Sequence, residues 1–123
     1  MNIEKTVYNG QTIAVVSGGK QEIKDVGTAL DMMMSACAIA DSSRIAIEKG
    51  ALDESFFILS TGFAGEVLQK FINYRCKVAI YGDFTRYTSK PLRDFIYESN
   101  RGKDVFFAAT REEALERLST AAE

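Results

Sequence analysis

The chain has 123 residues, of which 46% are hydrophobic and 26% charged, and its net charge at pH 7 is −2. A chain of this length and apolar content can bury a core of its own, so we expect a single domain over residues 1–123. Acidic and basic residues are mixed without a basic block, and no stretch has the character of a signal peptide or a membrane span. We therefore expect a cytoplasmic protein that binds neither nucleic acid nor membrane.

Two β-branched, apolar runs open the chain and predict an antiparallel hairpin. Residues 3–8 and 12–17 are separated by Asn9-Gly10, a pair that tolerates positive φ and is typical of two-residue hairpin turns. The segment Ser17-Gly18-Gly19-Lys20 is similar to the end of a phosphate-binding loop. Because the earlier glycine that such a loop requires is absent, we interpret this segment as a turn.

Asp25 is predicted to cap the first helix, since a carboxylate before an apolar periodic stretch can accept hydrogen bonds from free backbone N–H groups. The helix is expected to end near residues 41–43. The residues predicted to face the core, at helical spacing, are Val26, Leu30, Met33, Met34 and Cys37.

Three short apolar runs lie between helical segments and are predicted to be parallel strands joined by crossovers: residues 44–48, 77–81 and 105–108. A second helix is indicated by one apolar stripe, made of Phe63, Val67, Leu68, Phe71 and Ile72.

A third helix with Leu92, Phe95 and Ile96 inward follows Pro91, which suits a first helical turn. Thr110 to Glu113 has the spacing of a capping box and opens a final helix. The predicted fold is α/β, in the order β-β-α-β-α-β-α-β-α. Its sheet is mixed and mostly parallel, with an N-terminal antiparallel hairpin and about four helices.

The chain lacks the residues of several common catalytic and metal sites. It contains no histidine, and Cys37 and Cys76 stand far apart in the sequence, each in apolar surroundings. The usual zinc ligands and the Ser-His and Cys-His catalytic pairs are therefore missing. We interpret the cysteines as core residues of a reducing compartment, without a redox role. The sequence predicts no metal, no cofactor and no enzymatic activity.

The order of elements resembles that of STAS domains, the fold of sulfate transporters and anti-sigma-factor antagonists. In that fold a hydroxyl pair and a glycine follow the third strand and open the second helix. In this sequence Ser60-Thr61-Gly62 holds that place, and Phe63 follows. The family usually has an acid directly before the hydroxyl pair, where this chain has Leu59.

A second resemblance covers most of the chain. The segments TGFAGEVLQKFINYR, VAIYGDF and YTSKPLRDFIYESNRG resemble a bacterial family called domain of unknown function 4180, a resemblance that implies no activity. The STAS resemblance implies a non-enzymatic interaction module in signalling or transcriptional regulation, with a kinase-like protein partner. The sequence does not determine whether the chain forms homo-oligomers.

Ser60, Thr61, Gly62 and Phe63 are the partner-binding or regulatory candidates that the STAS resemblance implies. The same stretch has a purely structural interpretation, in which a hydroxyl caps the second helix and the glycine allows a tight turn after a strand. If a hydroxyl here is exposed, phosphorylation would add about −1.5 to −2 charges near the positive end of the helix dipole and change what docks there.

An alternative site lies between residues 82 and 95. Asp83 follows a strand at the edge where open α/β sheets place ligands. Thr88 or Ser89 would cap the next helix, whose N–H groups could hold an anion with help from Lys90 and from Arg86 or Arg93. This pattern predicts a small-ligand or anion-binding domain, or a small enzyme. The competing interpretation is a capped helix with a solvated basic flank.

Overall fold

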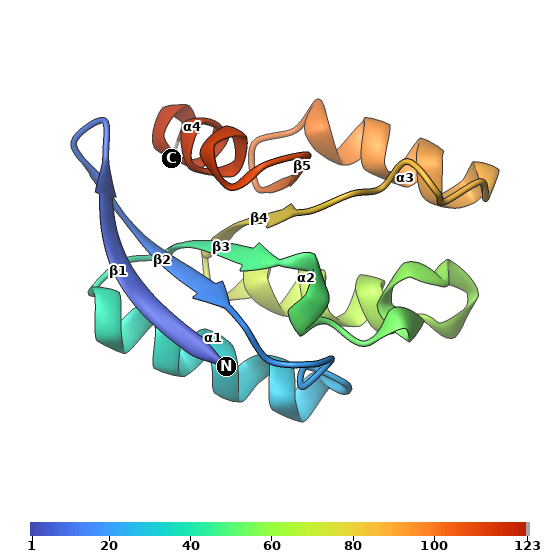
Figure 1. Ribbon diagram of the computed structural model, residues 1–123, viewed down its shortest axis with the longest axis horizontal. Helices are drawn as coiled ribbons and strands as arrows, with labels where there is room; N and C mark the ends of the chain where they lie inside the picture. The colour runs from blue at the N-terminus through green and yellow to red at the C-terminus, as the bar shows by residue number, and fades with distance from the viewer. Residues whose placement is uncertain (123) are drawn as a thin grey trace.

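A five-stranded sheet in the order β1-β2-β3-β4-β5 forms the centre of the computed structural model, which describes residues 1–122 (Figure 1). β1 (Asn2–Tyr8) pairs antiparallel with β2 (Gln11–Ser17), and Asn9 and Gly10 both adopt positive φ at the turn. The other strands run parallel to β2: β3 (Arg44–Glu48), β4 (Lys77–Tyr81) and β5 (Val105–Ala108). The predicted mixed α/β fold is confirmed.

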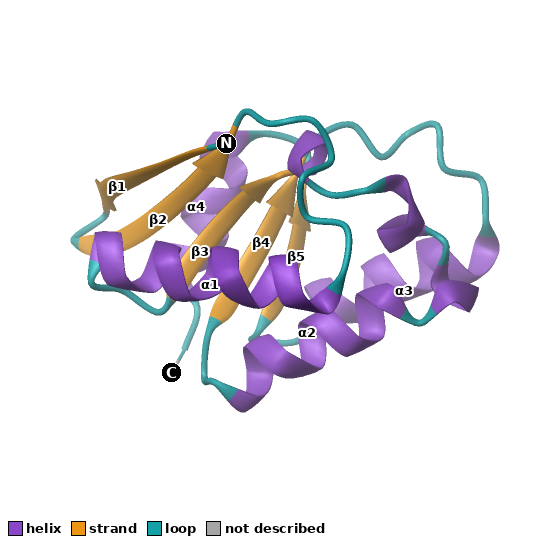
Figure 2. Ribbon diagram, turned by 90° about the horizontal axis from the view of Figure 1, so that it is seen from below, coloured by secondary structure: helices purple, strands orange, loops and turns teal. Residues whose placement is uncertain are grey.

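Helices cover both faces of this sheet, as Figure 2 shows. α1 (Val26–Ala40) and α2 (Phe63–Asn73) lie on one face, and α3 (Lys90–Asn100) packs beside β5. α4 (Arg111–Thr120) crosses the other face. Leu92 of α3 belongs to the same core as α1 and α2, so the chain runs to opposite faces after β4 and after β5. Loops cover the carboxyl ends of β3 and β4.

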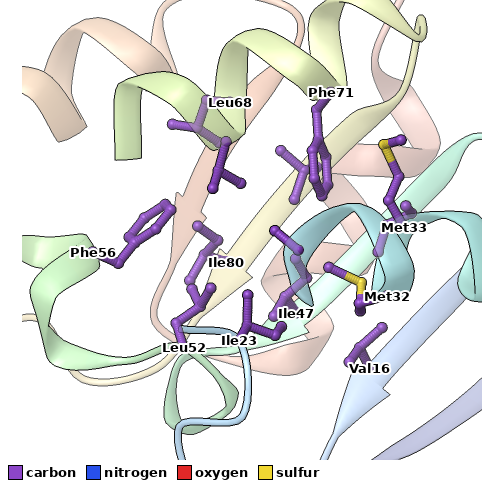
Figure 3. Packing of buried hydrophobic residues seen from close by; sticks show 14 of the residues in the cluster. Val16, Ile23, Met32, Met33, Ile47, Leu52, Phe56, Leu68, Phe71 and Ile80 are labelled. Carbon is purple, nitrogen blue, oxygen red and sulfur yellow. The ribbon is translucent and has the colours of Figure 1, made fainter. Parts of the chain in front are cut away.

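Buried side chains alternate between the two faces along each parallel strand, as the two-residue period of a strand requires. On the side of α1 and α2, Val16, Ile47 and Ile80 pack with Met32 and Phe71 (Figure 3). On the side of α4 the core is smaller, and its strand residues are Ile13, Val15, Ala46, Ala79, Phe106 and Ala108. β3, β4 and β5 are buried on both faces, which explains their continuous apolar sequences.

The predicted inward faces of α1 and α2 are each wrong at one position. Met34 is exposed, whereas Met33 is buried as predicted and Met32, which is not predicted to face the core, is buried as well. The three consecutive methionines carry no periodicity, and the stripe of α1 that faces the sheet is completed by alanines. Ile72 is likewise exposed, because Phe71 beside it turns toward the core.

The predicted caps are formed, with one difference in detail. At α1, Asp25 accepts a hydrogen bond from the Thr28 N–H at 2.7 Å, and the Thr28 hydroxyl accepts one from the Asp25 N–H. At α4, the Thr110 hydroxyl accepts from the Glu113 N–H at 3.1 Å. The expected return bond from Glu113 to the Thr110 N–H is replaced by one to the Ala109 N–H.

Asn100, at the end of α3, binds the backbone of the edge strand β5. Its amide nitrogen donates to the Phe107 carbonyl oxygen at 3.2 Å, and its amide oxygen accepts from the Phe107 N–H at 2.7 Å. The Asn100 side chain therefore satisfies both backbone groups of Phe107, the N–H and the carbonyl oxygen, which point away from β4.

Candidate functional site

Two irregular segments, here called the edge loops, cover the carboxyl ends of β3 and β4. The first edge loop spans residues 49–62 and contains three short 3-10 turns, at Lys49–Ala51, Glu54–Phe57 and Leu59–Thr61. The second spans residues 82–89 and leads into α3. Ligands of open α/β sheets bind at this edge, so the geometry of these loops decides what the chain can recognise.

A cluster of aromatic rings joins the two edge loops. Phe57 of the first loop is only 4% exposed and stacks on Tyr87 of the second, with ring centroids 5.2 Å apart. Phe84 lies 5.9 Å from Phe57 and 5.6 Å from Phe107 of β5. Offset and edge-to-face contacts of this kind stabilise the packing beyond the burial of the rings. This cluster of Phe57, Phe84 and Tyr87, here called the aromatic platform, holds the two loops together.

Lys49 places a positive charge against this platform. Its Nζ lies 4.9 Å from the centroid of the Tyr87 ring and 5.5 Å from that of Phe57, within the range of cation–π attraction. Lys49 also forms an ion pair with Glu54, whose Oε1 lies 3.7 Å from the Lys49 Nζ. The Tyr87 hydroxyl donates to the same carboxylate at 2.9 Å, and burial raises the pKa of Tyr87. Lys49 and Glu54 thereby link the loops.

Gly82 permits the close approach of Lys49 to β4. A Cβ placed on Gly82 would lie 2.7 Å from the Lys49 Cβ, closer than side chains tolerate. Its φ of 157° is also unfavourable for residues with a side chain. The Gly82 N–H donates to the Ala108 carbonyl oxygen at 3.0 Å and so continues the sheet by one bond.

One hollow at the edge loops, the strand-end hollow, has a volume of about 400 Å³ and opens between the ends of β3 and β4. It is lined by Glu48, Lys49, Gly50, Tyr81, Gly82, Asp83 and Arg86. Glu48 is engaged inside the fold, since its Oε2 accepts a hydrogen bond from the Gly18 N–H at 3.1 Å. That bond fixes the turn after β2. Burial, together with the charge of Glu48, raises the pKa of Tyr81.

Asp83 lies at the end of β4, as the sequence predicts, but its carboxylate closes a turn. Asp83 Oδ1 accepts hydrogen bonds from the Thr85 hydroxyl at 2.6 Å and from the Thr85 N–H at 2.9 Å. These bonds, the hydroxyl first, lower the pKa of Asp83. A carboxyl group with a lowered pKa is a weak base near pH 7, so this geometry favours a turn residue over a general base.

Replacing Thr85 with valine is expected to raise the pKa of Asp83 toward its usual value. The substitution keeps the shape of the side chain and removes the hydroxyl, while the backbone N–H bond still stabilises the carboxylate. The rise should therefore be incomplete, and an NMR titration of the Asp83 carboxyl carbon measures it. An unchanged pKa would show that the Thr85 hydroxyl does not hold the carboxylate in solution.

The four candidates near α2 have different surroundings. The Thr61 hydroxyl is held by two hydrogen bonds: it donates to the Ser55 carbonyl oxygen at 2.9 Å and accepts from the Phe63 N–H at 3.2 Å. Gly62 is the N-cap of α2 with φ 78°, and Phe63 is buried. Ser60 is exposed. β3 ends at Glu48, as predicted, and the first edge loop connects this strand to Ser60-Thr61-Gly62.

The candidates near α3 are largely engaged with neighbouring groups. Ser89 caps α3 by accepting from the Leu92 N–H at 3.4 Å, and the adjacent Thr88 is exposed. Lys90 pairs with Asp94 at 2.6 Å. Two further basic residues complete the set: Arg86 approaches Glu54 at 3.8 Å, and Arg93 is exposed. The charge of Lys90 is therefore neutralised by Asp94, whereas Arg86 makes only a long ion pair and stays accessible.

The second hollow, called the loop hollow, brings the two candidate regions together. It has a volume of about 430 Å³ and is lined by residues 57–60 from the first edge loop and by Arg86, Tyr87, Thr88, Ser89, Pro91 and Leu92. Ser60 and Ser89 thus line one surface, although the sequence treats them as parts of rival sites. Ile58 lies there with 56% of its surface exposed.

The residues that sequence reasoning missed are Lys49, Glu54, Phe57 and Ile58. A weak signal was present, because Lys49-Gly50 directly follows a strand and Phe56-Phe57-Ile58-Leu59 is apolar without a clear period. Their meeting with Tyr87 depends on the tertiary fold. In the described part of the chain, no helix has both the length and the apolar character needed to cross a bilayer, and no group of acidic residues and cysteines could hold a metal ion.

These features define an α/β protein with a parallel sheet edge covered by aromatic loops. Residues 8–118 match the model of a protein family described as a domain of unknown function, DUF4180. The chain belongs to this family. No curated protein and no solved structure matched this chain in the comparisons.

Proposed function

We propose that this chain is a cytoplasmic, non-enzymatic interaction module that docks a protein partner in the loop hollow. The observation that carries the proposal is the exposure of Ile58 beside a hollow with a polar rim. Protein interfaces commonly combine a buried apolar centre with such a rim. The resemblance to STAS domains adds a role in signalling, with the partner contacting the start of α2.

The charge at the rim indicates the chemistry of the partner. The side chain of Arg86 is 74% exposed, and its only ion pair among the described residues is the long one to Glu54. A segment with an apolar side chain for the hollow and a neighbouring carboxylate for Arg86 would satisfy both features. The aromatic platform beneath keeps the surface in shape before binding, which lowers the entropic cost of association.

Ser60 is the residue at which this docking could be regulated. It is exposed and lines the same hollow as Arg86. A phosphate on its hydroxyl would compete with an acidic partner for Arg86 and repel the partner's carboxylate. Thr61 serves a different purpose, since its hydroxyl holds backbone groups on both sides of the η3 turn (Leu59–Thr61). An acidic residue at Thr61 would disturb the fold, and Ser60 is the cleaner site to test.

Ile58→Asp and Ser60→Glu are expected to weaken partner binding at least tenfold, because each places negative charge in a surface that accepts an apolar, acidic segment. The control is Val7→Asp, a matched change on β1 at a side chain that is 66% exposed and outside the loop hollow. Proteins retained by the wild-type chain in quantitative affinity purification would be purified, and their dissociation constants measured by calorimetry. Circular dichroism would check that each variant folds.

The comparison between variants decides the outcome. Loss of affinity at Ile58 and Ser60 with full affinity at Val7 would support the loop hollow. Equal affinity of all variants, or the absence of any partner that binds in purified form, would overturn the proposal. In that case the alternative is a small-ligand site, favoured by the convergence of Asp83, Arg86 and Tyr81 at the strand-end hollow.

A further inference from the structure

The two cysteines, far apart in sequence, meet in the fold. Cys37 lies in the last turns of α1, and Cys76 lies between α2 and β4. Their Sγ atoms are 3.7 Å apart, and both are free thiols. Cys76 belongs to the core and Cys37 packs against it, as the sequence predicts, and the fold brings the two together as a dithiol.

A surface hollow gives access to this dithiol. It is lined by Met33, Met34, Cys37, Asp41, Ser42, Ser43, Tyr74 and Cys76, with a volume of about 420 Å³. Cys37 is partly exposed at the hollow, whereas Cys76 is only 4% exposed. A small oxidant can therefore reach Cys37 first, while Cys76 stays beneath it as the second thiol.

We propose that Cys37 and Cys76 form a peroxide-oxidisable pair that closes to a reversible intramolecular disulfide. In the first step the Cys37 sulfur attacks one oxygen of hydrogen peroxide, the O–O bond breaks, and a sulfenic acid and water form. In the second step the Cys76 sulfur attacks the Cys37 sulfur and displaces its hydroxyl group, which leaves as water with the Cys76 proton. Two thiols and one peroxide thus give one disulfide and two waters.

The local geometry suits this order of events. A disulfide needs a sulfur–sulfur distance of about 2.05 Å, so the two sulfurs must approach by about 1.7 Å from their 3.7 Å separation. Burial, aided by the neighbouring Cys37, raises the pKa of Cys76 to about 12. Cys76 therefore remains a protonated thiol at neutral pH and is a poor first target for peroxide, and it must lose its proton as it attacks the oxidised Cys37.

The disulfide would enclose the segment from Cys37 to Cys76, which contains β3, the first edge loop and α2. Closing a loop of this length restricts the unfolded chain and stabilises the folded one. We expect the midpoint of thermal unfolding to rise by roughly 5 to 15 °C on oxidation, because the cross-link restricts the unfolded chain far more than the folded one.

The experiment treats the fully reduced protein with a small excess of hydrogen peroxide. The expected product is a monomer that has lost two hydrogens and both titratable thiols, carries a Cys37–Cys76 cross-linked peptide, and unfolds at higher temperature. Dithiothreitol should reverse all four changes: the mass, the number of titratable thiols, the cross-linked peptide and the unfolding temperature should return to those of the reduced protein. Peptide mapping separates this change from oxidation of the exposed Met34.

Cys37→Ala and Cys76→Ala serve as matched controls, and neither should gain thermal stability on oxidation. The wild-type result stands even if one of these variants folds poorly. Unreacted thiols, sulfinic acid at Cys37 without a cross-link, or disulfides only between molecules would each overturn the proposal. A cross-linked monomer that is not restored by dithiothreitol would overturn its reversibility.

Discussion

Replacing Phe57 with alanine is expected to lower the free energy of unfolding by about 3–5 kcal/mol, the usual cost of removing a buried phenylalanine ring. Phe57 contacts rings on both edge loops, and the Lys49 ammonium lies 5.5 Å from its centroid. Its removal leaves a cavity and also releases Tyr87 and Lys49. A loss of this size is a large part of the 5–15 kcal/mol that stabilises a typical domain.

Equilibrium unfolding in urea would measure this loss, with Phe57→Leu as the control. Leucine fills most of the same volume but has no aromatic face, so its cost should be nearer 1 kcal/mol. If alanine at position 57 costs less than about 0.5 kcal/mol, as ordinary surface substitutions do, the aromatic platform does not hold the edge loops together in solution.

A second large effect is expected at Gly82. Substitution with alanine should cost about 2–4 kcal/mol, because the new Cβ would lie 2.7 Å from the Lys49 Cβ and the backbone would keep an unfavourable φ. The Lys49 Cβ is fixed by its own backbone and cannot swing away as the end of a side chain could. The end of β4 and the first edge loop must then separate.

Gly65→Ala is the matched control for this prediction. Gly65 lies in α2, and a Cβ there would meet no atom within 4 Å. Alanine is the better helix former, so this variant should gain about 0.5–1 kcal/mol. Denaturant unfolding of both variants would show the opposite signs. Equal stability of Gly82→Ala and the wild type would mean that the strand end and the loop are not packed as closely as the distance implies.

The parts of the fold that local chemistry dictates could be predicted from the sequence. Asn9-Gly10 specifies the hairpin turn, and Asp25, Ser89 and Thr110 begin three helices with hydrogen bonds to their own neighbours. The buried parallel strands appear as continuous apolar runs. In each case the stabilising partner lies within a few residues, or burial alone determines the pattern.

The candidate site was less accessible to such reasoning, since its contacts join distant segments. Nothing local places Tyr87 on Phe57 or brings Ser60 and Ser89 to one hollow. The apolar residues from Phe56 to Leu59 lack the period of a helix or a strand because they form 3-10 turns. The approach of Cys37 to Cys76 likewise depends on how α1 and α2 pack, which spacing along the chain cannot reveal.

The side chain of Asn100 has a consequence for how molecules of this protein meet one another. β5 is an edge strand, and an unpaired edge strand can accept a strand from a second molecule. By occupying both outward backbone groups of Phe107, the amide of Asn100 removes the bonding positions on which such a strand would align. A strand from a second molecule would therefore have to displace the Asn100 amide before it could pair with β5 at Phe107.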